Sequence, residues 1–258
     1  MSSSGDPNAA LEEFKRANAA CFRAVSERPD VEVVYSADAA GMSGERARLP
    51  YPARDLAPEQ VAQVRGEADA LAIKLKHHDA AKHARRMPKG DVAPVIFQAL
   101  EEARIEAVGG RNMAGLRENI AAAHELRYRR MGFHRISERS EAAMPEVIRL
   151  MARQALTGAP PPPAARKAVD AWRGQLQGMI GQQIDKLRGL IDDQDSYAEA
   201  VRRLIQDMAI DLGDMANEED PDSDAEDGEA ADDNQARGDE DQESGDQDSQ
   251  SASGEMES

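Results

Sequence analysis

The sequence lacks several features that mark common classes of protein. Its 258 residues include one cysteine and one tryptophan, and aromatic residues make up only 3% of the chain. A single cysteine, Cys21, cannot form an internal disulfide or a zinc site by itself, and a reducing cytoplasm is the expected location. No apolar run approaches the roughly 20 residues of a membrane-spanning helix. Residues 1–10 are polar, without the charged start and apolar stretch of a secretory signal.

The negative charge of the chain is concentrated at its C-terminal end. The formal net charge is −17, from 49 acidic and 32 basic side chains. Residues 214–258 hold 19 of the acidic side chains and a single basic one, Arg237, so the preceding residues carry a net charge of +1. Because nucleic-acid binding needs an accumulated basic surface, we expect no nucleic-acid partner. With almost nothing to bury, residues 213–258 are expected to form a disordered acidic tail.

Apolar residues recur at helical spacing along most of the chain before this tail. The strongest signal is the alternation of three- and four-residue steps through Val61, Val64, Ala68, Leu71 and Leu75. The expected fold class is therefore mainly α, a helical bundle. The predicted helices cover residues 11–25, 58–86, 92–108, 113–131, 141–156, 164–191 and 196–212.

Two short segments have the composition of strands. Residues 31–36 contain β-branched and aromatic residues, and residues 45–50 follow across a loop with Gly41 and Gly44. This pattern predicts one small antiparallel β-hairpin near residues 31–50.

The expected domain organisation follows from these segments. A helical domain with the hairpin covers residues 1–156, and residues 157–163 form a stiff proline-rich spacer. A helical segment at 164–212 packs on or next to that domain, and the acidic linker or tail occupies 213–258.

Three of the five histidines lie close together, as His77, His78 and His83. Imidazole nitrogens with a carboxylate are ligands for zinc, cobalt or nickel, so these three residues are the candidate metal ligands, with Glu102 as a further one. On one continuous helix, however, His78 and His83 would lie about 140° apart around the axis. His78 also continues the apolar stripe, so a hydrogen-bonded core histidine is the favoured interpretation.

Two arginines in the second predicted strand are candidates for contact with a partner. Arg46 and Arg48 alternate with Ala47, so both point to one face of the strand. Two adjacent guanidinium groups either pair with carboxylates of the protein's own helices or present a fork to a partner's carboxylate. Internal pairing is the favoured alternative.

No catalytic or cofactor-binding residue can be assigned from motifs. The sequence contains no G-x-x-x-x-G-K-[ST] phosphate-binding loop. Glu101, Glu102 and Glu106 are interpreted as ion-pair partners of Arg104 and its neighbours on a solvated helix face. The residues alone therefore predict a helical interaction module with an acidic tether.

Several blocks of the sequence stand out in a fixed order. They are GERARLPYPARDL (44–56), RGEADALAIKLKHHD (65–79), ARIEAVG (103–109), RNMAG (111–115) and RYRRMG (127–132). In this order they resemble the CobT family, a cobaltochelatase subunit of aerobic cobalamin biosynthesis. The resemblance covers most of residues 10–212, and the acidic tail matches an acidic linker of that family.

The resemblance implies an adaptor that is itself non-catalytic. It implies a ring-shaped hetero-oligomer with the AAA+ subunit CobS, which drives Co²⁺ insertion by CobN into hydrogenobyrinic acid a,c-diamide. ATP, Mg²⁺ and Co²⁺ are then used by the partner subunits, and no cofactor is expected on this chain.

The sequence departs from the family pattern at one point, and two other functions remain open. Family members end in a von Willebrand factor A domain with a D-x-S-x-S motif, which this sequence lacks, so it is expected to be a fragment or a truncated gene product. The alternatives are a metal-binding or metal-delivery module that uses His77, His78 and His83, and an interaction protein that acts through its acidic tail.

Overall fold

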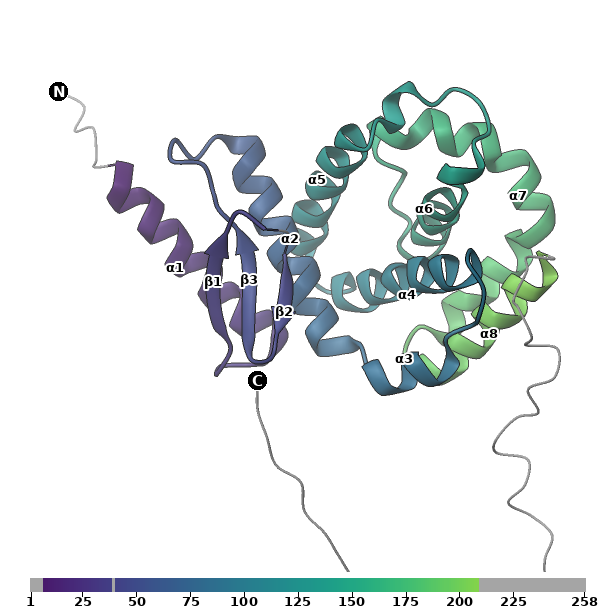
Figure 1. Cartoon of the computed structure of the whole chain (residues 1–258), viewed down its shortest axis with the longest axis horizontal. Coiled ribbons are helices and arrows are strands. Elements are labelled where there is room, and N and C mark those ends of the chain that lie inside the picture. The colour runs from purple at the N-terminus through teal and green to yellow at the C-terminus, as the bar shows by residue number, and fades with distance from the viewer. Residues whose placement is uncertain (1–6, 39, 209–258) are drawn as a thin grey trace, which may run out of the picture. The chain divides into compact units, whose positions relative to one another are not determined.

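The structure, a computed structural model, describes residues 7–38 and 40–208. This part of the chain contains eight α-helices and one small sheet, which confirms the mainly α fold class (Figure 1). The expected acidic tail, residues 213–258, lies outside the described residues.

The N-terminal part consists of one helix and three short strands. Helix α1 (Pro7–Ser26) is followed by β1 (Glu32–Ser36), β2 (Gly41–Ser43) and β3 (Arg46–Pro50). The strand order is β1-β3-β2. The central strand β3 pairs in parallel with β1 and antiparallel with β2.

The predicted pairing of the two strand segments is wrong. Residues 31–36 and 45–50 are β1 and β3, but they run parallel instead of forming an antiparallel hairpin. The hairpin partner of β3 is β2, which lies in the region predicted as a loop. Its tight turn requires Gly44, whose φ of +58° belongs to the left-handed region that glycine adopts without strain.

The helix predicted to run to residue 86 is two helices. Helix α2 (Pro58–His77) ends at His78, whose backbone is extended, and α3 (Ala80–Arg86) follows. The Asp79 side chain accepts hydrogen bonds from the backbone N–H groups of Ala81 and Lys82. Asp79 is thus the N-cap of α3. Because aspartate favours this capping position, a new helix begins here and interrupts the longer helix that the apolar spacing predicts.

The remaining helices form the larger core, in which α4 is central. Most residues of helix α4 are buried, and it packs against α6, α2 and α8. Figure 1 shows α4 surrounded by the other helices. The helices are α4 (Ala93–Gly110), α5 (Ala114–Arg130), α6 (Met144–Thr157), α7 (Arg166–Leu187) and α8 (Gln194–Asp207).

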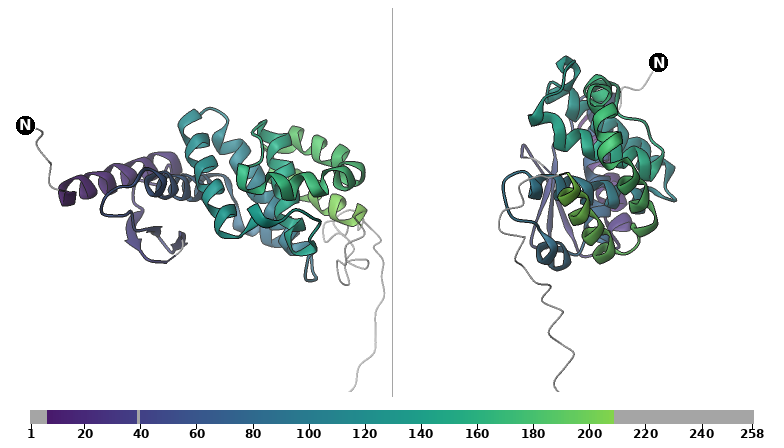
Figure 2. Two further views of the ribbon diagram at one scale, coloured as in Figure 1. Left: turned by 90° about the horizontal axis from the view of Figure 1, so that it is seen from above. Right: turned by 90° about the vertical axis from the view of Figure 1, so that its right-hand side faces the viewer.

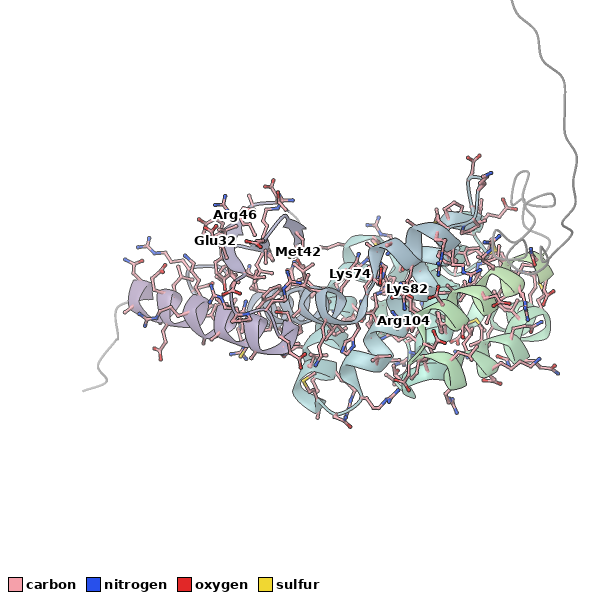
Figure 3. The ribbon with its side chains drawn as sticks, turned by 90° about the horizontal axis from the view of Figure 1, so that it is seen from below. Glu32, Met42, Arg46, Lys74, Lys82 and Arg104 are labelled. Carbon is pink, nitrogen blue, oxygen red and sulfur yellow. The ribbon has the colours of Figure 1, made fainter. Side chains whose placement is uncertain are left out.

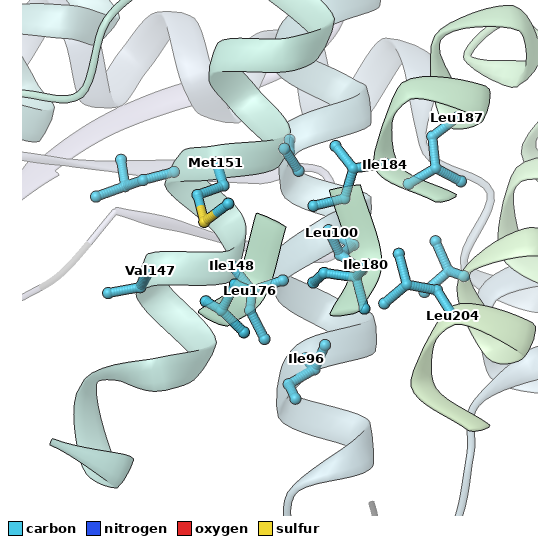
Figure 4. Close-up of a cluster of buried hydrophobic side chains, with 14 of the residues drawn as sticks. Ile96, Leu100, Val147, Ile148, Met151, Leu176, Ile180, Ile184, Leu187 and Leu204 are labelled. Atoms are coloured by element: carbon cyan, nitrogen blue, oxygen red, sulfur yellow. The ribbon is translucent and has the colours of Figure 1, made fainter. Parts of the chain in front are cut away.

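The helical segment after the proline-rich spacer shares this core with the helices before it. Side chains of α4, α6, α7 and α8 form one continuous apolar cluster (Figure 4). Trp172 on α7, the single tryptophan, is 6% exposed within it. Residues 164–208 therefore pack directly on the first helical part.

A smaller core joins the sheet to the helices. Phe22 of α1, Ala47 and Leu49 of β3, and Ala68 and Ala72 of α2 are buried against one another. Figure 2 shows the sheet on one side of α1 and α2. Because α2 also packs on α5 and α4, it links the sheet to the larger core.

Two glycines allow α2 to approach its neighbours closely. A Cβ atom on Gly66 of α2 would lie 2.2 Å from the backbone oxygen of Asn119 on α5. A Cβ atom on Gly109 of α4 would lie 2.6 Å from Ile73 of α2. Neither helix pair can keep its present spacing with a larger residue at these positions.

Helices in the described part of the chain are either too short or too polar to cross a membrane.

Candidate functional site

Two acidic residues on α4 face two basic residues on α6. Glu102 and Glu106 are four residues apart on α4, and Arg149 and Arg153 are four residues apart on α6. Residues at this spacing lie on the same side of a helix. Because α4 packs against α6, the two pairs meet in the interior.

Glu106 is the centre of this arrangement. One of its oxygens, Oε1, accepts hydrogen bonds from Arg149 Nη2 at 2.6 Å and from His124 Nε2 of α5 at 2.9 Å. The other oxygen, Oε2, accepts from Arg153 Nε at 2.8 Å. The four residues are between 3% and 8% exposed. The carboxylate thus connects α4, α5 and α6 in a dry environment.

Arg149 extends the arrangement to two further side chains. Its Nη1 donates to the Tyr128 hydroxyl at 3.0 Å, and that hydroxyl donates to Glu146 Oε2 at 2.6 Å. Arg149 Nε lies 3.2 Å from Glu102 Oε2. We call this set the Glu106 cluster; its members are Glu102, Glu106, His124, Tyr128, Glu146, Arg149 and Arg153.

Burial and pairing fix the protonation states in the Glu106 cluster. Burial alone would raise the pKa of the Glu106 carboxyl, but His124, Arg149 and Arg153 together hold it well below its usual range. Burial lowers the pKa of His124 despite the adjacent carboxylate, and burial raises the pKa of Tyr128. At neutral pH the carboxyl is ionised, the imidazole neutral and the phenol protonated. None of them is matched to acid–base catalysis near pH 7.

A cavity of about 480 Å³ opens beside the Glu106 cluster, between α2, α4 and α5. Its charged floor is formed by cluster members. Its rim carries Arg127, which pairs with Glu146, and Arg130, which donates to Gln63 at 2.7 Å. Most of the other lining residues are small or apolar, and Glu67 and Lys74 line the cavity as well; the small or apolar ones are Ala40, Gly66, Ala70, Leu71, Ile105, Ile120, Ala123 and Met131. The cavity can accept an apolar group, whereas the charged groups on its floor already pair with one another.

The break between α2 and α3 is held by Arg104, on another face of α4, and by Gln194 of α8. Arg104 forms a bidentate pair with Glu101, with both N···O distances 2.7 Å, and its Nη2 also donates to the His77 carbonyl at 2.7 Å. The Gln194 side chain of α8 accepts from the backbone N–H of Asp79 and donates to its carbonyl, both at 2.8 Å. The break is therefore fixed from α4 and α8.

The break brings two of the three candidate histidines together. The ring centroids of His78 and His83 are 4.9 Å apart, and His78 Nδ1 lies 2.8 Å from Glu101 Oε1. Ligand atoms of His78, His83 and Glu101 all lie within 4.8 Å of one another. The group does not include His77, nor does it include Glu102, which belongs to the Glu106 cluster.

The two candidate arginines lie on the exposed side of β3. Arg46 Nη2 is 2.8 Å from Glu32 Oε2 of β1, and Arg48 Nη1 is 3.7 Å from Asp38 Oδ2 of the following loop. Figure 3 shows Arg46 and Glu32 next to each other on the sheet. Both arginines pair internally, as favoured from the sequence, but their partners come from the sheet and its loop instead of from a helix.

Sequence reasoning missed the burial of the acidic residues on α4. Glu101 is 3% exposed and Glu106 is 8% exposed, so the predicted solvated face is wrong. The pairing of Glu101 with Arg104 was anticipated, but the role of Arg149 and Arg153 was not. A usable signal was present, since both arginines interrupt the apolar stripe of their helix at the i, i+4 spacing that complements Glu102 and Glu106.

The family model described as "Cobalamin biosynthesis protein CobT" matches residues 8–258. No solved structure matches the chain.

Proposed function

Because the chain belongs to the CobT family of cobalamin biosynthesis proteins, we propose that it is the non-catalytic adaptor subunit of an ATP-dependent cobaltochelatase. In this proposal it works in the cytoplasm with the AAA+ subunit CobS. Together they drive Co²⁺ insertion by CobN into hydrogenobyrinic acid a,c-diamide. The observation that carries the proposal is the match of one family over residues 8–258.

The interior of the protein supports a structural role for its charged residues. In the Glu106 cluster, Glu106 is bound by Arg149, Arg153 and His124. The pKa of Glu106 is held far below neutral pH and that of Tyr128 is raised by burial, so the cluster serves better to hold helices together than to transfer protons. ATP hydrolysis and metal insertion are accordingly assigned to the partner subunits.

Buried ion pairs make α4 suitable for transmitting a movement. They join α4 to α6 through Glu106, and a hydrogen bond from Arg104 to the His77 carbonyl joins α4 to the α2–α3 break. Rigid elements connected by such networks can carry energetic coupling between distant sites. In a ring-shaped hetero-oligomer, α4 and the helices around it would move as one body when the ATPase changes state.

The exposed face of β3 is the proposed contact surface for a partner carboxylate. The side chains of Arg46 and Glu32 are 59% and 57% exposed, and pairs at such exposure contribute about 0–1 kcal/mol to stability. If Arg46 left its pair with Glu32 and paired with a carboxylate of a partner instead, the loss of stability would therefore be small. The guanidinium groups keep their charge in either arrangement.

Co-purification with CobS tests this proposal. We expect the full chain to be retained by tagged CobS in the presence of a non-hydrolysable ATP analogue. The Arg46→Glu/Arg48→Glu double variant should be retained several-fold less, because a reversed charge repels the partner carboxylate. Arg203→Glu, an exposed change on α8, is the matched control and should be retained like the wild type. Absence of retention of the wild-type chain would contradict a docking role.

The acidic-tail alternative makes a different prediction for the same assay. If residues 214–258 provide the contact, deleting them abolishes retention, and retention of the full chain falls steeply with added salt. If the folded part docks, the deletion leaves retention intact. The metal-binding alternative is favoured by a separate observation, the grouping of His78, His83 and Glu101.

A further inference from the structure

We propose that His78, His83 and Glu101 bind one divalent transition-metal ion. The two imidazoles and the carboxylate already place their ligand atoms within 4.8 Å of one another. Two histidines and one glutamate are a known set of three protein ligands for Zn²⁺ that leaves a fourth position open. The proposal concerns a site on this chain and does not depend on its assignment as an adaptor.

His83 provides the clearest sign of an absent partner. Its ring is 7% exposed, and its Nε2 atom is buried without a hydrogen-bond partner among the described residues. Buried polar atoms in proteins are nearly always satisfied, so each exception requires a reason such as a bound ion. Burial lowers the pKa of His83, which keeps the imidazole neutral, and the neutral ring is the metal-binding form.

Glu101 can bind an ion without giving up its pair with Arg104. Its Oε1 atom accepts from both Arg104 Nη2 and His78 Nδ1. An ionised carboxylate has about four lone-pair positions, so an ion can take the place of the His78 contact while the arginine contact remains. Nδ1 of His78 is then a ligand atom in the tautomer that carries its proton on Nε2. Arg104 would act as the outer partner that orients the carboxylate.

The break between α2 and α3 makes this grouping possible. On a continuous helix the two histidines would point in directions about 140° apart. Arg104 and Gln194 instead fix the backbone at His77 and Asp79 so that the histidine rings meet. Because these contacts are independent of the ion, the ligands are arranged before it binds.

His78 gives the site a route to solvent. It lies on the wall of an open cavity of about 420 Å³ whose other walls include Asp79, Asp192 and Asp193. These three carboxylates are matched in number by the cations Lys76, Lys82 and Arg104 on the same walls, so the lining carries no net charge that would attract a cation. The cavity is open, so an ion can reach His78 from this side. The ligand set favours Zn²⁺, Co²⁺ or Ni²⁺ over Mg²⁺ or Ca²⁺.

Titration of the full chain with Co²⁺ tests the proposal, because visible d–d absorption reports the coordination of this ion. Excess Mg²⁺ is included to saturate the carboxylate-rich tail, which prefers oxygen-binding ions. We expect one Co²⁺ per chain with a d–d spectrum of mixed nitrogen and oxygen ligation. His78→Gln and His83→Gln should each weaken binding about 100-fold or more, since even outer partners of metal ligands account for 10- to 100-fold.

His77→Gln is the matched control, because His77 is adjacent in sequence but outside the ligand group; it should bind Co²⁺ like the wild type. A wild-type chain that binds no Co²⁺ above the Mg²⁺ background would overturn the proposal. Equal binding by His83→Gln and the wild type would overturn it as well. If a variant fails to fold, Zn²⁺ titration of the wild type followed by histidine NMR decides, since only the His78 and His83 signals should shift. A shift of His77 instead would also reject the site.

Discussion

Glu106 shows how one residue can determine the stability of several helices. It is 8% exposed and is the only carboxylate that Arg153 contacts among the described ion pairs. Arg149 also contacts Glu106, and both guanidinium groups lie in the interior. A buried pair is costly to break, because removing one partner leaves an uncompensated charge in a medium of low dielectric constant.

Glu106→Gln is therefore expected to destabilise the protein by about 3 kcal/mol or more. The glutamine preserves the shape of the side chain but leaves Arg153 without a carboxylate. Urea unfolding followed by Trp172 fluorescence measures the loss, since this residue lies in the larger core. Glu102→Gln is the control: the Glu102 side chain is 34% exposed and the expected loss is about 1 kcal/mol or less. Equal losses for the two variants would show that Glu106 is not the centre of the cluster.

His124 gives the stability of the protein a dependence on pH. Its pKa in the folded state lies below the ordinary value of 6.5, because burial disfavours the charged ring. The stability contribution of neutral His124 is complete above about pH 6.5 and is lost as the pH falls toward the folded pKa. Burial is also the main cause that lowers the pKa values of His77 and His83. Their contributions to stability are therefore lost as the pH falls, as for His124.

His124→Gln should therefore flatten the decline of stability below about pH 6.5. A glutamine Nε2 can still donate a hydrogen bond to Glu106, but it does not titrate. The free energy of unfolding is measured by urea denaturation at several values between about pH 7 and 5. His134→Gln, a change of an exposed histidine, controls for the loss of one histidine. Identical slopes for His124→Gln and the wild type would contradict this account.

The sequence predicts some residue positions well and others poorly. The common face of Arg46 and Arg48 follows from the two-residue period of a strand, which is a local property. The burial of Glu106 does not follow from the local sequence, because it depends on α6, about 40 residues later in the chain. Local patterns suggest that a charged residue faces solvent, and only the arginines of another helix reverse that expectation.

At the scale of elements, α2 is the connection between the sheet and the larger core. It packs on α1, α4 and α5, and the contact with α5 depends on Gly66. A Cβ at Gly66 would meet backbone atoms of Asn119, which cannot rotate away as a flexible side chain would. The two helices would have to separate.

Gly66→Ala is expected to destabilise the protein by about 1–3 kcal/mol, as overpacking of a core does. Gly178→Ala is the matched control on α7, where the glycine is exposed and an added Cβ would meet nothing within 4 Å. That change should stabilise by up to about 1 kcal/mol, because alanine favours a helix over glycine. Thermal unfolding of both variants gives the comparison. A stabilising effect of Gly66→Ala would contradict the close contact between α2 and α5.

The predicted elements agree with the structure where apolar spacing alone decides them. The helices predicted at 92–108 and 113–131 correspond closely to α4 and α5. The break after α2 was missed because the apolar stripe continues through His78, whereas Asp79 caps a new helix. The parallel pairing of β1 with β3 was missed because the antiparallel partner of β3 is β2. This strand has three residues, and its sequence gives little indication of a strand.

On the scale of the whole molecule, the described residues form helices built around α4, with charged networks on two of its faces. One network joins α4 to α5 and α6, and the other joins it to α8 through Gln194 and to the α2–α3 break. Such a body is suited to holding and moving other subunits, which is the role proposed for it in the chelatase.

The most direct test of that role is a measurement of Co²⁺ incorporation into hydrogenobyrinic acid a,c-diamide. The purified chain is assayed alone with ATP and Mg²⁺, and CobS and CobN are assayed beside it with and without the chain. The adaptor account predicts no incorporation above background for the chain alone, and incorporation only where the partner subunits are present. Incorporation of Co²⁺ by the chain without its partners would contradict it.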